Sequence, residues 1–131
     1  MTPFVTAGAG FLLAVLWFDL MFDIQIRRAE HRDQAVASIA AYYRRVTIEA
    51  YPMNRLVAVV MFCVLGALVA QLADGEAPRW ASISSLVLAL GAIGLAVGHT
   101  FRNGARLGSG QGMPEEREAL ARLMLRDHVI C

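Results

Sequence analysis

The chain has 131 residues, of which 57% are hydrophobic and only 18% are charged, and its net charge is +1. Disorder is excluded because disordered chains are poor in apolar residues and rich in charge. A soluble domain of this length could not bury so many apolar side chains away from water. The composition therefore predicts a single domain that is solvated partly by lipid and has no excess positive charge for binding nucleic acid.

Three apolar stretches have the length of membrane-spanning helices, which need about 20 residues. The first covers residues 4–22 and is apolar except for Asp19. No basic residue precedes it and it runs into Asp23 rather than a small-residue cleavage site, so we expect a retained span, not a signal peptide. The second covers residues 53–72 and the third residues 80–101. The short polar link between these two spans predicts that they are antiparallel neighbours, and the expected fold class is all-α.

Two further helices are expected outside the spans. Residues 33–51 are too charged to span, but they carry apolar side chains at helical spacing, and these are Val36, Ile39, Tyr43, Val46 and Ala50. This segment is predicted to lie at the membrane interface or beneath the spans. The alternative is one helix that runs on into the second span with a kink at Pro52. Residues 103–113 are glycine-rich and predict a flexible linker. Pro114 then opens an amphipathic helix over residues 114–130.

The basic residues predict the orientation of the chain. All twelve are arginines: six lie between the first span and the start of the second, one lies in the link between spans two and three, and five follow span three. Arginine-rich flanks stay in the cytoplasm. The pattern predicts that the N-terminus lies outside and the C-terminus in the cytoplasm.

Glycines on the third span predict a packing face. Gly91, Gly94 and Gly98 lie on or near one side of the helix, and small residues allow two helix backbones to approach closely within a membrane. Three helices also form a thin bundle. We therefore expect a homo-oligomer, or docking to a larger membrane complex, with membrane lipids as the other partner.

The predicted topology brings a cluster of polar residues to the inner ends of the three spans. These residues are Asp19, Asp23, Asn54, Arg55, His99, Arg102 and Asn103. An aspartate one turn inside the boundary needs a partner, and the expected partners of Asp19 are Arg102, Arg55 and His99. Two interpretations stay open: a structural lock between helices, or a proton-handling, metal or headgroup site.

No residue pattern assigns a cofactor or a metal to this cluster. Asp19, Asp23, His99 and Glu49 have side chains that bind divalent ions, but their spacing matches no metal motif. His128 lies in a predicted cytoplasmic segment and is expected to be solvated. Cys63 and Cys131 fall at different depths and are not expected to form a disulfide.

Three segments carry a resemblance. LWFDLMFDIQ near the start, and HTFRNGARLGSG and LARLMLRDHVIC near the end, resemble small uncharacterised bacterial inner-membrane proteins. The resemblance implies a bacterial inner membrane. It brings no activity and no site residue with it.

The leading functional hypothesis is a non-enzymatic membrane protein that acts as a homo-oligomer or as an accessory subunit. A small oligomeric transporter or channel is the first alternative, although no span carries a polar face along its whole length. A membrane enzyme acting on a lipid or quinone headgroup is the second alternative. No catalytic residue is assigned, and whether the chain is an enzyme stays open.

Overall fold

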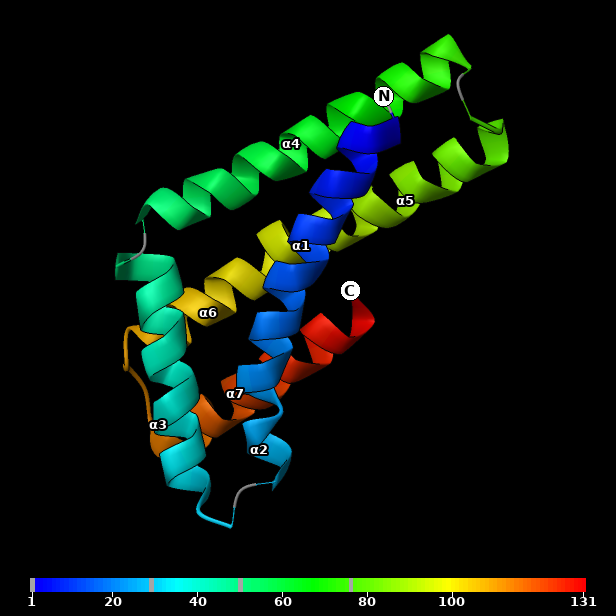
Figure 1. Cartoon of the computed structure of the whole chain (residues 1–131). Coiled ribbons are helices and arrows are strands. Elements are labelled where there is room, and N and C mark those ends of the chain that lie inside the picture. The colour runs from blue at the N-terminus through cyan, green and yellow to red at the C-terminus, as the bar shows by residue number, and fades with distance from the viewer. Residues whose placement is uncertain (1, 29, 50, 76) are drawn as a thin grey trace.

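The computed structural model describes residues 2–28, 30–49, 51–75 and 77–131, and this part of the chain is helical with no strand (Figure 1). The all-α prediction is confirmed. The elements in chain order are α1 (Thr2–Asp23), α2 (Gln25–Arg28), α3 (Arg32–Tyr43), the π-helical turn η1 (Arg44–Glu49), α4 (Tyr51–Asp74), α5 (Arg79–Leu95), the π-helical turn η2 (Ala96–Thr100), α6 (Phe101–Gly108) and α7 (Pro114–Ile130).

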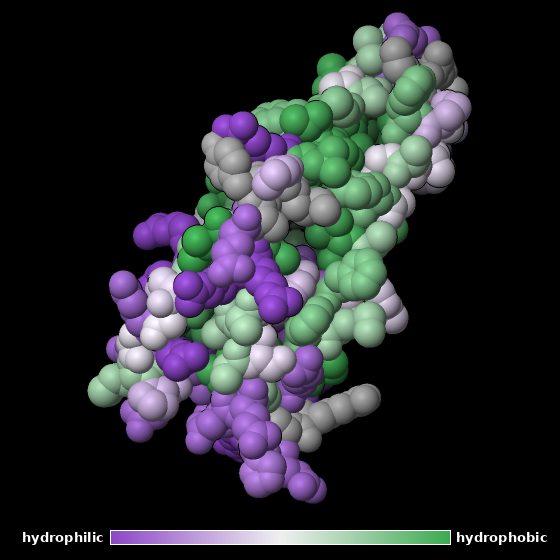
Figure 2. Space-filling model, turned by 60° about the vertical axis from the view of Figure 1, so that its left-hand side comes forward, coloured by the Kyte–Doolittle hydropathy of each residue, from purple (hydrophilic) through white to green (hydrophobic). Residues whose placement is uncertain are grey.

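Three helical stretches are long and apolar enough to cross a membrane, and they match the three predicted spans. They cover Thr2–Arg27, Asn54–Asp74 and Arg79–Gly108. In the most apolar 18 residues of each stretch, only 0%, 17% and 6% of the residues, respectively, are buried inside the protein. Figure 2 shows apolar surface over the half of the molecule that holds these helices, whereas polar residues gather at the other end. So much uncovered apolar surface is suited to lipid as its solvent.

The apolar helices pack around α4. Helices α4 and α5 run antiparallel and are joined by a turn (Figure 1) in which Gly75 has a φ of 68°. A left-handed residue of this kind is strained for any residue with a Cβ. On another side of α4, Gly8 of α1 lies so close to Val64 that a Cβ at position 8 would overlap it. The antiparallel arrangement predicted for spans two and three is confirmed.

The compact core of the protein lies at one end of the apolar helices, where α2, α3, α6 and α7 meet the end of α1. Its buried residues are Ile26, Val36, Ile39, Ala40, Tyr43, Leu107, Ala121, Met124 and Leu125. The predicted apolar stripe of α3 is confirmed at Val36, Ile39 and Tyr43, and Ala50 lies outside the described residues. Helix α3 therefore packs at one end of the apolar helices, and the axis of α4 points in a sharply different direction from that of α3 (Figure 1).

The expected linker over residues 103–113 is wrong in its first half. Residues 103–108 are helical and continue the third apolar helix as α6, so that the non-helical link is residues 109–113. The glycines here serve packing rather than flexibility. A Cβ at Gly108 would lie 2.8 Å from the backbone nitrogen of Arg44, and one at Gly104 would lie 3.2 Å from the ring of Tyr43.

The glycine face of the third span makes no close contact inside the chain. A Cβ at Gly91, Gly94 or Gly98 would have no described atom within 4 Å other than its own helix and chain neighbours. No described residue of the chain makes the predicted close contact, because α4 covers a different side of α5, and a contact with a second chain stays a prediction. This face is left for lipid or for another protein chain.

Helix α7 begins as predicted. Pro114 occupies its first turn, where the missing amide hydrogen is not needed. The backbone amide of Met113 donates to Oε2 of Glu116 at 3.2 Å. The helix then packs on α1, α3 and α6, which brings its last turns to the C-terminal end of α1.

Candidate functional site

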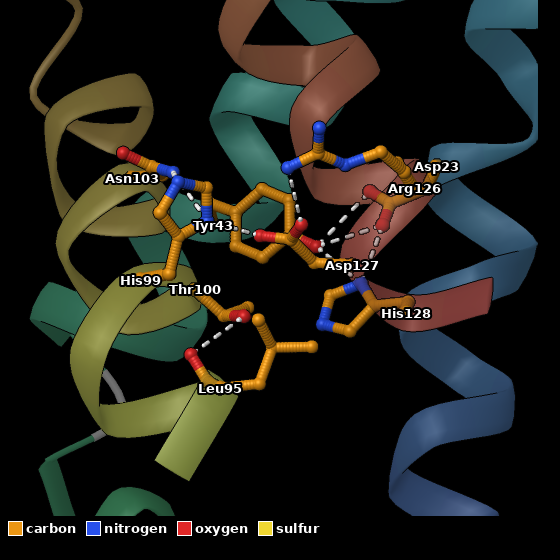
Figure 3. Close-up of polar contacts among 9 residues, drawn as sticks. All are labelled: Asp23, Tyr43, Leu95, His99, Thr100, Asn103, Arg126, Asp127 and His128. Atoms are coloured by element: carbon orange, nitrogen blue, oxygen red, sulfur yellow. Dashed lines mark hydrogen bonds and ion pairs between the residues drawn. The ribbon is translucent and has the colours of Figure 1, made fainter. Parts of the chain in front are cut away.

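Asp23, the last residue of α1, is fully buried and connects three helices. The hydroxyl of Tyr43 in α3 lies 3.0 and 3.1 Å from its two carboxylate oxygens. Nδ1 of His128 in α7 lies 2.6 Å from Oδ2 (Figure 3). Breaking a buried charge pair by removing one partner is strongly destabilising. This carboxylate therefore fixes α3 and α7 to the end of the first apolar helix.

Asp19 lies one turn further into the same helix. Its Oδ1 accepts a 2.6 Å hydrogen bond from the hydroxyl of Tyr42, whose ring stacks on Phe22 with centroids 4.1 Å apart. Its Oδ2 lies 3.9 Å from Nε2 of His128. That distance is within reach of an ion pair but is too long for a hydrogen bond.

A second histidine–aspartate pair joins α7 to the third apolar helix. Asp127 is fully buried, and its Oδ2 lies 2.5 Å from Nδ1 of His99 in η2. Arg126 donates to the other oxygen of Asp127 at 3.3 Å, and Nδ2 of Asn103 lies 3.2 Å from Nδ1 of His99 (Figure 3). Two adjacent residues of α7 thus hold two different apolar helices.

Burial and neighbouring charges shift the pKa of His128, Tyr42 and Tyr43, which lie outside the apolar helices. Burial alone would lower the pKa of His128, but the hydrogen bond to Asp23 and the carboxylates of Asp23, Asp19 and Asp127 outweigh it and raise this pKa above 6.5. Burial, with the neighbouring carboxylates, raises the pKa of the Tyr42 and Tyr43 hydroxyls. Both tyrosines therefore keep their protons and act as donors.

A cavity of about 280 Å³ lies beside this cluster. Its polar lining includes Asp19, Tyr42 and His128. The remaining lining is largely apolar and comes from all the helices that meet here. It consists of Val15, Phe18, Tyr43, Val46, Thr47, Asn54, Val57, Thr100, Phe101, Gly104 and Met124. A small apolar pocket with a few convergent polar groups is the usual form of a ligand site.

Both π-helical turns contribute to this cavity. Thr47 comes from η1 and Thr100 from η2. Their hydroxyls donate to backbone carbonyls, Thr47 to Tyr43 at 2.5 Å and Thr100 to Leu95 at 3.4 Å. π-helical turns inside α-helices occur frequently at functional sites. In this protein, η1 and η2 each form part of the cavity wall.

The structure divides the predicted polar cluster. Asp19 and Asp23 lie at its centre, but the expected pairing of Asp19 with His99 is wrong because His99 pairs with Asp127. Arg102 is exposed and forms no ion pair with a described residue. The contacts that Asp19 makes are to Tyr42 and His128.

The remaining predicted residues lie at the edges of the site. Asn54 lines the cavity, and its Nδ2 donates to the backbone carbonyl of Thr47 at 3.1 Å. Asn103 is buried beside His99. Arg55 is exposed at the start of the second span.

The sequence interpretation missed the contribution of α7. His128 was expected to be solvated but is only 7% exposed. One signal for this was available: Asp127 and His128 follow Met124 by three and four residues, so they continue the side of the helix that Leu120 and Met124 define. Polar residues that continue a buried stripe indicate a partner across the interface.

Comparison of the chain with protein-family models, with curated proteins and with solved structures gives no match. The described residues also contain no group of three or more metal-binding side chains that could hold an ion. The functional argument therefore rests on the geometry of the cavity and its two histidine–aspartate pairs.

Proposed function

We propose that this chain is a non-enzymatic bacterial inner-membrane protein that binds a small amphipathic molecule in the cavity at the inner ends of its apolar helices. The observation that carries the proposal is the cavity itself, which joins an apolar lining to the Asp19–Tyr42–His128 group. An apolar cavity of about 150 Å³ holds a benzene molecule. A volume of about 280 Å³ therefore has room for one ring with a short polar substituent.

The hydrogen bonds around the cavity support a preorganised binding site. The hydroxyls of Tyr42 and Tyr43 donate to Asp19 and Asp23, and those of Thr47 and Thr100 donate to backbone carbonyls. Side chains held in this way keep a cavity open and preorganised.

A cavity-filling substitution tests this proposal. In mild detergent, para-fluorobenzyl alcohol is expected to give a fluorine NMR signal from a bound state in the unaltered protein, distinct from the micelle signal. Val57→Phe should remove that signal, because Val57 lines the cavity. Val59→Phe is the matched control, since Val59 lies two residues further along α4 and is 56% exposed. Equal binding to all three proteins, or binding to none, contradicts the proposal.

The orientation belongs to the same proposal. The arginine-rich segments lie at the end of the molecule that holds α3 and α7, and only Arg79 lies at the opposite end. In a background without native cysteines, Ser109→Cys is expected to react with a membrane-impermeant maleimide only after the cells are opened. Asp74→Cys should react in intact cells, since both side chains are exposed. The reverse pattern would contradict the orientation.

The assembly is proposed to be a homo-oligomer or a larger membrane complex. The open face of Gly91, Gly94 and Gly98, together with the uncovered sides of all three apolar helices, supports this part of the proposal. Small residues permit close helix packing where lipid is the solvent. Native mass spectrometry from mild detergent would read both the number of chains and any bound small molecule.

A further inference from the structure

The hydrogen-bond donors around the cavity are nearly all in use, whereas acceptors remain. The hydroxyls of Tyr42 and Tyr43 and the amide group of Asn54 donate to protein oxygens. A carboxylate offers about four acceptor positions and no donor. A ligand in this cavity therefore gains most if it brings donors.

The free acceptors of the site have a defined spacing. Nδ1 of His128 faces Asp23, so that in the neutral ring it is Nδ1 that carries the proton. Nε2 then exposes its lone pair, 3.9 Å from Oδ2 of Asp19. Hydrogen bonds from N–H groups are about 2.9 Å long. One nitrogen with two hydrogens, placed between these atoms, reaches both of them.

The apolar part of the lining suits a cation as well. The rings of Phe18, Tyr42 and Phe101 line the cavity. Aromatic faces attract organic cations by about 0.5–2 kcal/mol, more when water is excluded. The same rings provide the contact area for a small apolar body attached to the charged nitrogen.

Building on the proposed binding function, we infer that the cavity takes a primary or secondary ammonium ion with a small apolar body, in exchange for the proton on His128. The ammonium nitrogen donates one hydrogen bond to Asp19 and one to Nε2 of His128. The proton that leaves Nε2 passes to the solvent. One positive charge enters and one leaves, so the charge of the site is conserved.

The surroundings of His128 favour such an exchange. The groups that face it are Asp19 and Asp23 from α1 and Tyr43 from α3. Asp127, its neighbour in α7, adds a further carboxylate, which also pairs with His99 of η2. The carboxylates raise the pKa of His128 above its ordinary value despite burial. The protonated form of His128 is therefore favoured in the empty site, where its charge occupies the place of the cation.

The test compares matched ligands on the whole protein in mild detergent. We expect para-fluorobenzylammonium to bind at least about tenfold more tightly than para-fluorobenzyl alcohol, as hydrogen bonds to charged groups contribute about 1.5–3 kcal/mol. The trimethylated ammonium, which has the charge but no N–H group, should also bind more weakly. Binding of para-fluorobenzylammonium should tighten between about pH 6 and about pH 8, because fewer protons then compete with it for Nε2 of His128.

Proton release gives a readout that needs no altered protein. Calorimetry at about pH 6 in two buffers of different ionisation enthalpy should show about one proton released for each ammonium ion bound. Asp19→Asn should weaken ammonium binding about tenfold or more, and its effect on alcohol binding should be clearly smaller. Asp74→Asn, an equal change of charge at the exposed far end of α4, should alter neither.

The outcomes separate the two proposals. If the alcohol and the ammonium ion bind equally well and no proton is released, the ammonium inference is overturned while the binding function stands. If neither compound gives a bound signal that Val57→Phe removes, the binding function fails first. Binding of the ammonium ion with no change between the two pH values overturns the exchange with His128.

Discussion

Asp23→Leu is expected to destabilise the protein by about 3–5 kcal/mol, which is the usual cost of removing one partner from a buried charge pair. Asp23 is fully buried, and the substitution leaves the hydroxyl of Tyr43 and Nδ1 of His128 without their acceptor. The measurement is the free energy of unfolding in mild detergent. Asp74→Leu, at an exposed position of α4, should change it little.

A double-mutant cycle shows whether this loss belongs to the pair. His128→Leu alone should also be strongly destabilising, because it leaves the Asp23 carboxylate buried without its cationic partner. The double variant Asp23→Leu/His128→Leu should cost less than the sum of the single variants, with a coupling of about 0.5–3 kcal/mol. Additive losses would show that the two side chains do not act together.

The pH dependence of stability follows from the same pair. The pKa of His128 is raised in the folded protein, so its charged form contributes stability that is complete below its unfolded value of 6.5. This contribution is lost as the pH rises through the higher folded pKa. The free energy of unfolding should therefore fall above about pH 6.5, and His128→Leu should flatten that slope. A stability that rises over this interval would contradict the assignment.

The sequence predicted the elements whose signal is local. The three spans follow from the length and hydropathy of uninterrupted runs, and α3 from apolar residues at helical spacing. The position of Asp19 about one turn before the end of α1 follows from helical rise along the first apolar stretch. Each of these inferences needs only the residues of one segment, and each agrees with the elements of the structure.

The partners of the carboxylates could not be predicted in the same way. The expected ion pair of Asp19 assumed that only the apolar helices meet at the boundary. In the structure, α7 returns to the end of α1 and brings His128 there, while Tyr42 and Tyr43 arrive from α3. Where an amphipathic helix docks depends on the shape of the surface that receives it, which hydrophobic periodicity does not encode.

Glycine gave the least reliable signal, because one residue type serves turns, flexible links and close packing. Gly104 and Gly108 were interpreted as part of a linker, yet they allow α6 to touch α3 and η1. Gly94 and Gly98 are predicted to form a packing face, and no described residue of the chain packs on them. What distinguishes them is the distance to a neighbouring backbone, and this is a property of the folded chain.

Gly108→Ala therefore provides the second large expected effect. A Cβ at this position would lie 2.8 Å from the nitrogen and 3.0 Å from the Cα of Arg44, and 3.0 Å from the carbonyl carbon of Tyr43. These are backbone atoms that cannot rotate away, so α6 has to move from η1. Overpacking costs about 1–3 kcal/mol, and we expect a loss of free energy of unfolding at the upper end of this range.

The same substitution at Gly94 should have the opposite sign. Its Cβ would meet no described neighbour, and alanine is favoured over glycine in a helix by up to about 1 kcal/mol.

Gly108→Ala should also weaken binding of para-fluorobenzyl alcohol, because Gly104, one helical turn earlier, lines the cavity and packs on Tyr43. Gly94→Leu should leave the stability of the single chain unchanged, so a change in native mass would place another chain on that face. Equal stability changes for Gly108→Ala and Gly94→Ala would show that α6 does not contact η1 as described.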